Sequence, residues 1–245
     1  MIKTIFVFIY IGFAMITFLP IGIVAFILYC LGLRAPMRQV VYRLAQAWAI
    51  SIIHVAGVKA EVSGRENIIR KGGVCFISNH CGYFDIILLL AYANRPFGFV
   101  AKKELTLVPA LNCWIFMLGG LFIDRKNIRK AIKTINNGVQ RIKNGSGMVI
   151  FPEGTRSKGH ELLPFHPGSF KLATASAAPV VPVAIVGSYD IFEKNARLTK
   201  APVKLAFLEV IETANLSAEE RKKNLPDKVF QVIKEQLDKF NSSNC

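Results

Sequence analysis

The N-terminal part of the chain contains a long run of apolar positions that no charged residue interrupts. The run extends from Thr4 to Leu33, and thirty residues of helix measure about 45 Å, more than the roughly 30 Å hydrocarbon core of a bilayer. It is too long for the apolar region of a cleaved signal peptide, so we expect a membrane anchor rather than a buried core helix. Pro20 leaves two forms open, because proline interrupts helical hydrogen bonding: one kinked span, or two short helices that fold back.

A second helical pattern follows at Ala35–Val58, with Pro36 suited to its first turn. Residues 1–60 are therefore predicted to form an N-terminal membrane-associated helical region that precedes one globular domain at residues 61–245. One basic residue precedes the apolar run and three follow it: Lys3, then Arg34, Arg38 and Arg43. Because basic residues favour the cytoplasmic side of a membrane, we expect the globular domain on that side.

Five apolar, β-branched runs in this domain predict strands: Val74–Ser78, Phe97–Ala101, Gly147–Phe151, Val180–Val186 and Val203–Ile211. Between and after them lie helical patterns, the clearest at residues 128–142. Another starts at Ser217, where Glu220 completes a capping box, and runs to Phe240. Since helices alternate with strands that are apolar on both faces, the pattern favours an α/β fold with a mostly parallel sheet covered by helices.

Composition narrows the choice of partners. The 245 residues are 52% hydrophobic and carry 31 Lys+Arg against 16 Asp+Glu, a net charge of +15. This excludes a disordered chain and favours a negative partner: nucleic acid, anionic lipid or a phosphorylated substrate. No nucleic-acid-binding module is recognisable, which disfavours the first. The five cysteines have no metal-ligand spacing, so we expect free thiols and no metal site.

Two loops that follow predicted strands carry candidate chemistry, because ligands bind at the carboxyl ends of parallel strands. In the first, His80 and Asp85 can meet only through a turn, for which Gly82 would leave room. The carboxylate would then fix one ring nitrogen and leave the other as a general base. The alternative is that Asp85 only caps a helix. Cys81 offers a second alternative, a cysteine nucleophile.

The second loop contains Glu153, Gly154, Thr155 and Arg156, a carboxylate and a guanidinium around a glycine. This arrangement suits an anion-binding loop, although a salt-bridged turn is an alternative. Lys102 and Arg125, which lie upstream of it, are further candidates for a substrate phosphate or are solvated charges.

Four segments in this order resemble a known family. They are NH-x4-D at residues 79–85, GGLFIDR at 119–125, FPEGTRS at 151–157 and VVPVAI at 180–185. Together they are similar to the four blocks of the glycerolipid acyltransferases, most closely the 1-acyl-sn-glycerol-3-phosphate (lysophosphatidate) acyltransferases. The resemblance extends over about residues 74–186 and makes residues 61–245 an acyltransferase domain. Many family members have a polar residue in the x4 stretch, which here is Cys-Gly-Tyr-Phe.

The resemblance implies a role for each block. His80 would be the catalytic base and Asp85 its orienting partner. The phosphorylated acceptor would be held by Arg125 together with Glu153, Gly154, Thr155 and Arg156, and Lys102 is added as a basic candidate. The reaction would move an acyl chain from acyl-coenzyme A or acyl carrier protein to lysophosphatidic acid, without a cofactor or metal, to give phosphatidic acid.

Two alternatives to this function remain open. The same chemistry could act on glycerol-3-phosphate, another lysophospholipid or an aminoacyl lipid. A more distant alternative is a non-catalytic membrane protein that binds anionic lipid. In each case the partners include the lipid bilayer and exclude nucleic acid.

Overall fold

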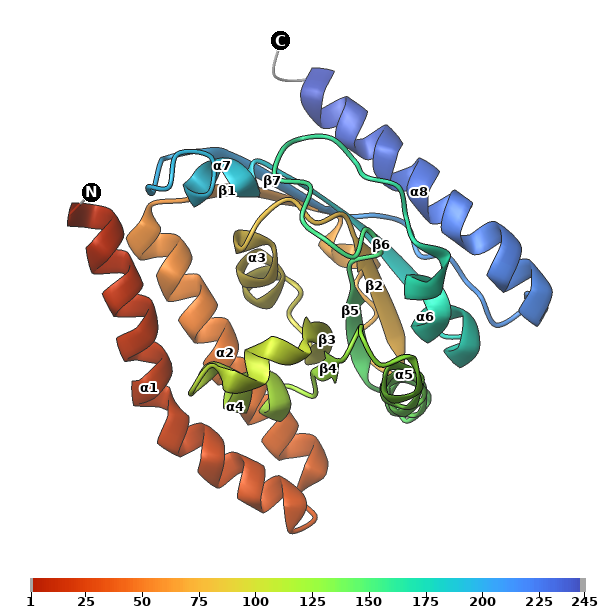
Figure 1. Ribbon diagram of the computed structural model, residues 1–245, viewed down its shortest axis with the longest axis horizontal. Helices are drawn as coiled ribbons and strands as arrows, with labels where there is room; N and C mark the ends of the chain where they lie inside the picture. The colour runs from red at the N-terminus through yellow and green to blue at the C-terminus, as the bar shows by residue number, and fades with distance from the viewer. Residues whose placement is uncertain (1, 243–245) are drawn as a thin grey trace.

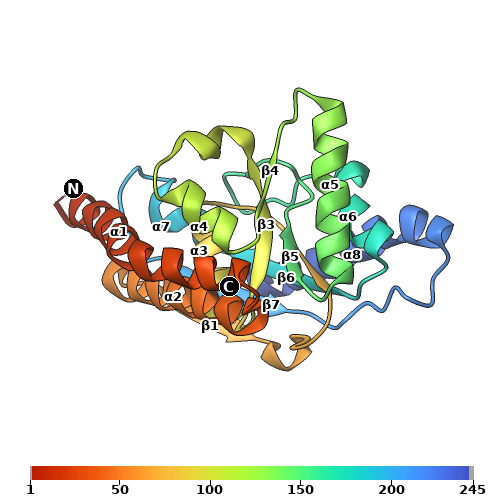
Figure 2. The same ribbon diagram turned by 90° about the horizontal axis from the view of Figure 1, so that it is seen from below.

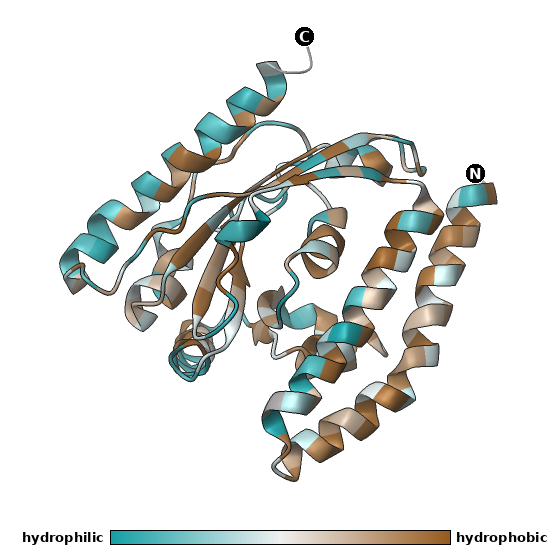
Figure 3. Ribbon diagram, turned by 180° about the vertical axis from the view of Figure 1, so that it is seen from behind, coloured by the Kyte–Doolittle hydropathy of each residue, from teal (hydrophilic) through white to brown (hydrophobic). Residues whose placement is uncertain are grey.

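The computed structural model describes residues 2–242 and begins with a long apolar helix, α1 (Ile2–Cys30). The helix is continuous through Pro20 and bends along its length (Figure 1), so the kinked single helix is found rather than two short ones. Only 17% of the most apolar 18-residue stretch of this helix is buried. This contradicts the alternative of a buried core helix. Figure 3 shows hydrophobic residues along most of it. Its length and composition are sufficient to cross a membrane, and they support membrane association.

The second helix, α2 (Arg34–Ala56), lies beside α1 and also packs on the globular part of the chain. Its buried face includes Tyr42, Ala49 and Ile52, which belong to the same apolar core as residues of the sheet. The Tyr42 hydroxyl donates to the Leu90 carbonyl oxygen at 3.2 Å. The two N-terminal helices and the sheet therefore share one core.

Within the described residues 2–242, seven strands form one twisted sheet with the order β1-β7-β6-β2-β5-β3-β4. The strands are β1 (Lys59–Ser63), β2 (Val74–Ser78), β3 (Phe97–Lys102), β4 (Leu121–Ile123), β5 (Gly147–Ile150), β6 (Val180–Val186) and β7 (Pro202–Phe207). All neighbours are parallel except β6 and β7. Because β2 to β6 run in one direction, their carboxyl ends meet at a single edge, where the site lies.

Helices cover both faces of this sheet (Figure 1). One core contains residues of α1, α2, α3 (Phe84–Tyr92) and α4 (Leu111–Met117). The other contains residues of α5 (Ile128–Lys143), α6 (Lys171–Ser176) and α8 (Ala218–Ser242). Short elements complete the chain: η1 (Arg65–Asn67), η2 (Lys103–Leu107), η3 (Pro167–Phe170) and α7 (Ser188–Phe192). Helices α1 and α5 thus lie on opposite faces of the sheet.

The predicted fold class is confirmed, and the differences lie in short elements. All five predicted strands are present, but β7 ends at Phe207 rather than Ile211, and β1 and β4 were not predicted. The predicted capping box before α8 is present: the Glu220 carboxylate accepts from the Ser217 N–H at 2.7 Å, and the Ser217 hydroxyl accepts from the Glu220 N–H at 3.1 Å.

Candidate active site

The site starts at the carboxyl end of β2, the middle strand of the sheet. The amide of Asn79 fixes the turn that follows, because it donates to the Ile185 carbonyl oxygen at 2.8 Å and accepts from the Ile185 N–H at 2.9 Å. Both residues are buried. The first and fourth sequence blocks therefore lie side by side and are connected by these two hydrogen bonds. The turn that follows Asn79 leads directly into α3.

His80 and Asp85 are paired through this turn, as the sequence predicted. The ring Nδ1 of His80 lies 2.7 Å from Oδ2 of Asp85. The same oxygen accepts from the backbone N–H groups of Cys81 at 2.7 Å and Gly82 at 3.0 Å, and the Asp85 side chain is fully buried. A carboxylate held by two N–H donors accepts from Nδ1–H, so Nε2 of His80 is the free acceptor. The arrangement suits a general base.

Three residues of the third sequence block contact His80 and fix its position. Its backbone N–H donates to Oε1 of Glu153 at 2.7 Å, and its carbonyl oxygen accepts from the Ser157 N–H at 2.8 Å. The imidazole stacks on the Phe151 ring, with 4.1 Å between ring centroids. The histidine side chain remains 21% exposed. Its position is thus fixed while one edge of the ring stays accessible.

Glu153 is almost completely buried, with 2% of its surface exposed. Burial raises the pKa of its carboxyl to about 7, and the negative charge of Asp85 adds to this effect. Hydrogen bonds from the N–H groups of His80 and Leu163 act in the opposite direction. The geometry gives Glu153 a supporting contact to the His80 backbone, and its side chain is too enclosed to lie at the surface of the site.

Cys81 is poorly suited to the alternative of a cysteine nucleophile. Its side chain is buried, with 2% exposed, and its sulfur accepts a hydrogen bond from the Asn79 amide at 3.1 Å. Burial raises the pKa of the thiol far above its usual range, and the carboxylates of Asp85 and Glu153 add to the shift. A thiolate nucleophile is disfavoured there.

The other cysteines and possible metal ligands within residues 2–242 form neither a disulfide nor a metal-binding cluster. The four cysteines within residues 2–242 are free, and Cys245 lies outside the described part of the chain. Within those described residues no cluster of three or more His, Cys, Asp or Glu side chains could hold a metal ion.

Arg156, in the third sequence block, contacts Tyr83 of the first block and Glu193, which follows α7. Its guanidinium carbon lies 3.8 Å from the centroid of the Tyr83 ring, and it forms an ion pair with Oε1 of Glu193. The other oxygen of Glu193 accepts from the Tyr83 N–H at 2.7 Å. Gly82 is needed for this close approach, because a Cβ there would lie 2.4 Å from Oε2 of Glu193 and 3.1 Å from Cα of Tyr189. The glycine thus provides space.

The remaining predicted residues lie at the same edge of the sheet. Nη1 of Arg125, an exposed residue, donates to the Gly154 carbonyl oxygen at 2.6 Å. Gly154 has a φ of +67°, which favours glycine. Thr155 is exposed next to it. Lys102 is exposed at the end of β3, where its backbone pairs with Ile123 of β4. Arg125 and Gly154 are therefore in contact, whereas Lys102 shares only the edge.

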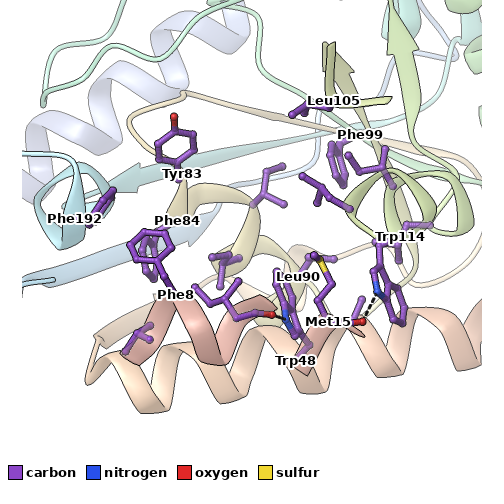
Figure 4. A pocket seen from close by; sticks show the side chains of 18 of the residues that line it. Phe8, Met15, Trp48, Tyr83, Phe84, Leu90, Phe99, Leu105, Trp114 and Phe192 are labelled. Atoms are coloured by element: carbon purple, nitrogen blue, oxygen red, sulfur yellow. Dashed lines mark hydrogen bonds between the residues drawn. The ribbon is translucent and has the colours of Figure 1, made fainter. Parts of the chain in front are cut away.

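A cavity of about 610 Å³ adjoins the turn, and its lining is almost entirely apolar. Figure 4 shows side chains from α1, α2, α3 and α4 directed into it, among them Met15, Trp48, Phe84 and Trp114. Tyr83, from the x4 stretch, lies above Phe84 in this view, lines the cavity and also stacks on Arg156. The cavity therefore extends from the charged part of the site to the N-terminal helices.

Glu193 and Phe151 were not identified as site residues from the sequence. Glu193 lies 40 positions beyond Glu153 and outside the four blocks. Only the strand order could have indicated Glu193. This residue follows β6, whose carboxyl end lies at the same edge of the sheet as that of β2. Phe151 was assigned to the end of a strand, whereas β5 ends at Ile150.

Comparisons with known proteins give a consistent result. The family model described as Acyltransferase matches residues 59–186. A 1-acyl-sn-glycerol-3-phosphate acyltransferase from Borreliella burgdorferi is 32% identical over 141 residues, which are 58% of this chain and 56% of that protein. A protein of the same name from Saccharomyces cerevisiae is 32% identical over 192 residues, 73% of this chain and 61% of that one. The aligned part is therefore less than two thirds of either relative.

A solved structure is similar over nearly the whole chain. It is the crystal structure of the 1-acyl-sn-glycerophosphate acyltransferase from Thermotoga maritima. The TM-score is 0.82 at 26% sequence identity, and the match covers 98% of this chain and 97% of that one. The similarity therefore includes the N-terminal helices, which lie outside the matched family model.

Proposed function

Because this chain belongs to the acyltransferase family, we propose that it transfers a fatty acyl group from an acyl thioester to the free hydroxyl of 1-acyl-sn-glycerol-3-phosphate, which gives phosphatidic acid. The observation that carries the proposal is the His80–Asp85 pair at 2.7 Å, held at the sheet edge by the third sequence block. The names of the relatives support the acceptor.

In the proposed reaction His80 acts through Nε2. This nitrogen takes the proton of the acceptor hydroxyl while the oxygen attacks the thioester carbonyl carbon. The tetrahedral intermediate then expels the thiolate as the carbon–sulfur bond breaks, and the imidazolium returns its proton to that sulfur. Asp85 keeps the ring oriented and stabilises its charged form. The products are an oxygen ester and a free thiol, and neither a metal ion nor an organic cofactor is required.

The acceptor phosphate is proposed to bind between Arg156 and Arg125. Only one terminal nitrogen of Arg156 is used by Glu193, so the rest of its guanidinium remains for a bidentate contact. Arg125 contacts the same loop two residues before Arg156, at the Gly154 carbonyl oxygen. Gly154 and Thr155 would contribute the backbone of the phosphate-binding loop. Glu153 would hold this loop against the backbone of His80. Lys102, at the end of β3, would add positive electrostatic potential near the phosphate.

The apolar cavity is proposed to hold an acyl chain. It is lined by side chains from both N-terminal helices and begins at Tyr83, beside the proposed phosphate site. A chain lying in it would have its carboxyl end close to His80. Helix α1 is proposed to anchor the protein in the bilayer with the catalytic domain at the cytoplasmic face, where lysophosphatidic acid in the membrane and a water-soluble donor can both reach the site.

The test is acyl transfer by the purified full-length protein. Palmitoyl-coenzyme A or a palmitoyl carrier protein is supplied with lysophosphatidic acid, glycerol-3-phosphate or another lysophospholipid, and the products are resolved by mass. We expect phosphatidic acid from the first acceptor. Preferred acylation of a different acceptor would leave the reaction type intact and change the substrate, whereas no acyl product with either donor and any acceptor would contradict the proposal.

A further inference from the structure

The first two turns of α5 form an exposed basic surface next to the site. It comprises Arg125 and Lys126, which precede the helix, and Arg129, Lys130 and Lys133 within it, all of them exposed. No Asp or Glu occurs between residues 125 and 143. The nearest acid, Asp124, is already paired with Lys103 at 2.9 Å. We call these five residues the α5 basic surface.

Helix stability does not explain this charge distribution. Arg129 and Lys130 lie in the first turn, where the helix dipole favours acids and disfavours cations. Arg129 and Lys133 are a like-charge pair four residues apart, which is also unfavourable. The helix start is instead stabilised by Asn127, whose side chain accepts from the Lys130 N–H at 3.0 Å. The charges therefore suit an acidic partner outside the chain.

Two isoleucines give this surface an apolar component. Ile128 is 73% exposed and Ile132 is 43% exposed. They continue the helical stripe of Val139 and Ile142, which are buried in the core. The apolar stripe of α5 thus extends beyond the part of the helix that the sheet covers. Exposed apolar side chains among basic ones are typical of a protein-binding surface.

The position of α5 favours a soluble protein over the bilayer. Figures 1 and 2 show α5 across the sheet from α1 and α2, so the apolar anchor and the basic surface lie on different sides of the molecule. At the same time the surface is close to the chemistry, because Arg125 contacts the Gly154 carbonyl oxygen. A partner bound there would face water and lie next to the site.

We propose that the α5 basic surface docks an acidic acyl carrier protein that delivers the fatty acyl thioester. The basic residues would pair with carboxylates of the carrier, and Ile128 and Ile132 would contact its apolar side chains. The inference rests on the proposed function, since it names one of the two thioester donors. Charge complementarity of this kind acts mainly on the rate of association.

The experiment compares two donors and two variants of the full-length protein. The test variant is Lys130→Glu/Lys133→Glu. The control is Lys222→Glu/Lys223→Glu, two exposed lysines on α8, which makes the same change in net charge. The kcat/KM value is measured with a palmitoyl carrier protein and with palmitoyl-coenzyme A, and binding of unloaded carrier protein is measured by calorimetry at two salt concentrations.

We expect the test variant to lose about tenfold or more in kcat/KM with the carrier-protein donor, to change less than about twofold with coenzyme A, and to bind carrier protein more weakly. The control should resemble the wild type. Equal losses with both donors, unchanged use of the carrier protein, or a wild type that neither binds nor uses it would overturn the docking proposal. Reduced binding to anionic vesicles with unchanged carrier use would identify lipid as the occupant instead. Failure of the proposed function gives a different result, because the wild type would then form no product with either donor, while binding of the unloaded carrier protein would still be measurable by calorimetry.

Discussion

The carboxylate of Glu153 accepts a hydrogen bond from the backbone N–H of His80 at 2.7 Å, so the third sequence block supports the backbone of the first. The contact is buried, and burial raises the pKa of Glu153 to about 7. A hydrogen bond of this kind cannot be assigned from sequence, because the two residues are 73 positions apart. It makes Glu153 a positioning residue for the proposed base.

The stability of the protein should depend on pH through Glu153. The carboxyl titrates at its usual 4.5 when unfolded and at about 7 when folded, so the folded state holds the proton more tightly. The free energy of unfolding contributed by this group should therefore be greatest below pH ~4.5 and fall as pH rises to ~7. Relative to Glu153→Gln, the wild type should lose about 2–3 kcal/mol between pH ~5 and ~8. Urea unfolding of both proteins measures this; parallel pH curves would remove Glu153 as the cause.

Replacing Asp85 by Asn should leave the fold intact and lower kcat by about 100-fold or more. The amide cannot fix the ring tautomer or stabilise the imidazolium, although it can still occupy the buried position. Steady-state kinetics should show little change in either KM. Asp227→Asn, an exposed site on α8, is the matched control. A kcat within about threefold of the wild type would mean that Asp85 only caps α3.

Arg156 and Glu193 should act together on the acceptor. Removing the guanidinium in Arg156→Ala loses charge-assisted hydrogen bonds and should raise the acceptor KM by about 10- to 100-fold, with a smaller effect on the donor. Glu193→Gln should raise the same KM less, because Arg156 keeps its contact with Tyr83 but loses its ion-pair partner.

A double-mutant cycle tests whether Glu193 acts through Arg156. If it does, Glu193→Gln should have little further effect in the Arg156→Ala background. Arg197→Ala, at an exposed position near α7, serves as the control. Additive effects, or effects confined to the donor KM, would contradict the placement of the phosphate.

The apolar cavity should set the length of the acyl chain that fits. Ile87 lies in its lining, so Ile87→Trp should shift activity toward shorter acyl donors, and Ile87→Ala should improve the relative use of longer ones. Competition between dodecanoyl and hexadecanoyl donors gives the ratio directly. If both variants lose activity without a change in that ratio, the cavity does not bind the acyl chain.

The sequence predicted the fold class from local patterns, whereas the spacing alone left the His80–Asp85 pair open and the resemblance of the four segments favoured it. Strands β2 and β6 are continuous apolar runs, and His80 and Asp85 are separated by one short turn. Strand β4 was missed because it has only three residues. Strand β1 was missed because Lys59 and Glu61 are exposed along it, on an edge of the sheet that is not covered on both faces.

The rest of the site depends on contacts that the chain makes only when folded. The antiparallel direction of β7 and the approach of Glu193 to Arg156 follow from how β6 and α7 pack, and no spacing in the sequence encodes them. The cavity likewise requires side chains from several helices and from strand β3 at once. The sequence predicted the residues that we propose to react, whereas packing determines what surrounds them.

The turnover of the His80→Ala variant tests most directly whether His80 is the general base. The full-length variant is compared with the wild type and with His54→Ala, an exposed histidine on α2, at matched protein level and membrane fractionation. Formation of phosphatidic acid from palmitoyl-coenzyme A and lysophosphatidic acid is followed by mass. We expect a loss of about 1,000-fold or more in kcat for His80→Ala and normal turnover for His54→Ala. Turnover of His80→Ala close to that of the wild type would show that His80 is not the base.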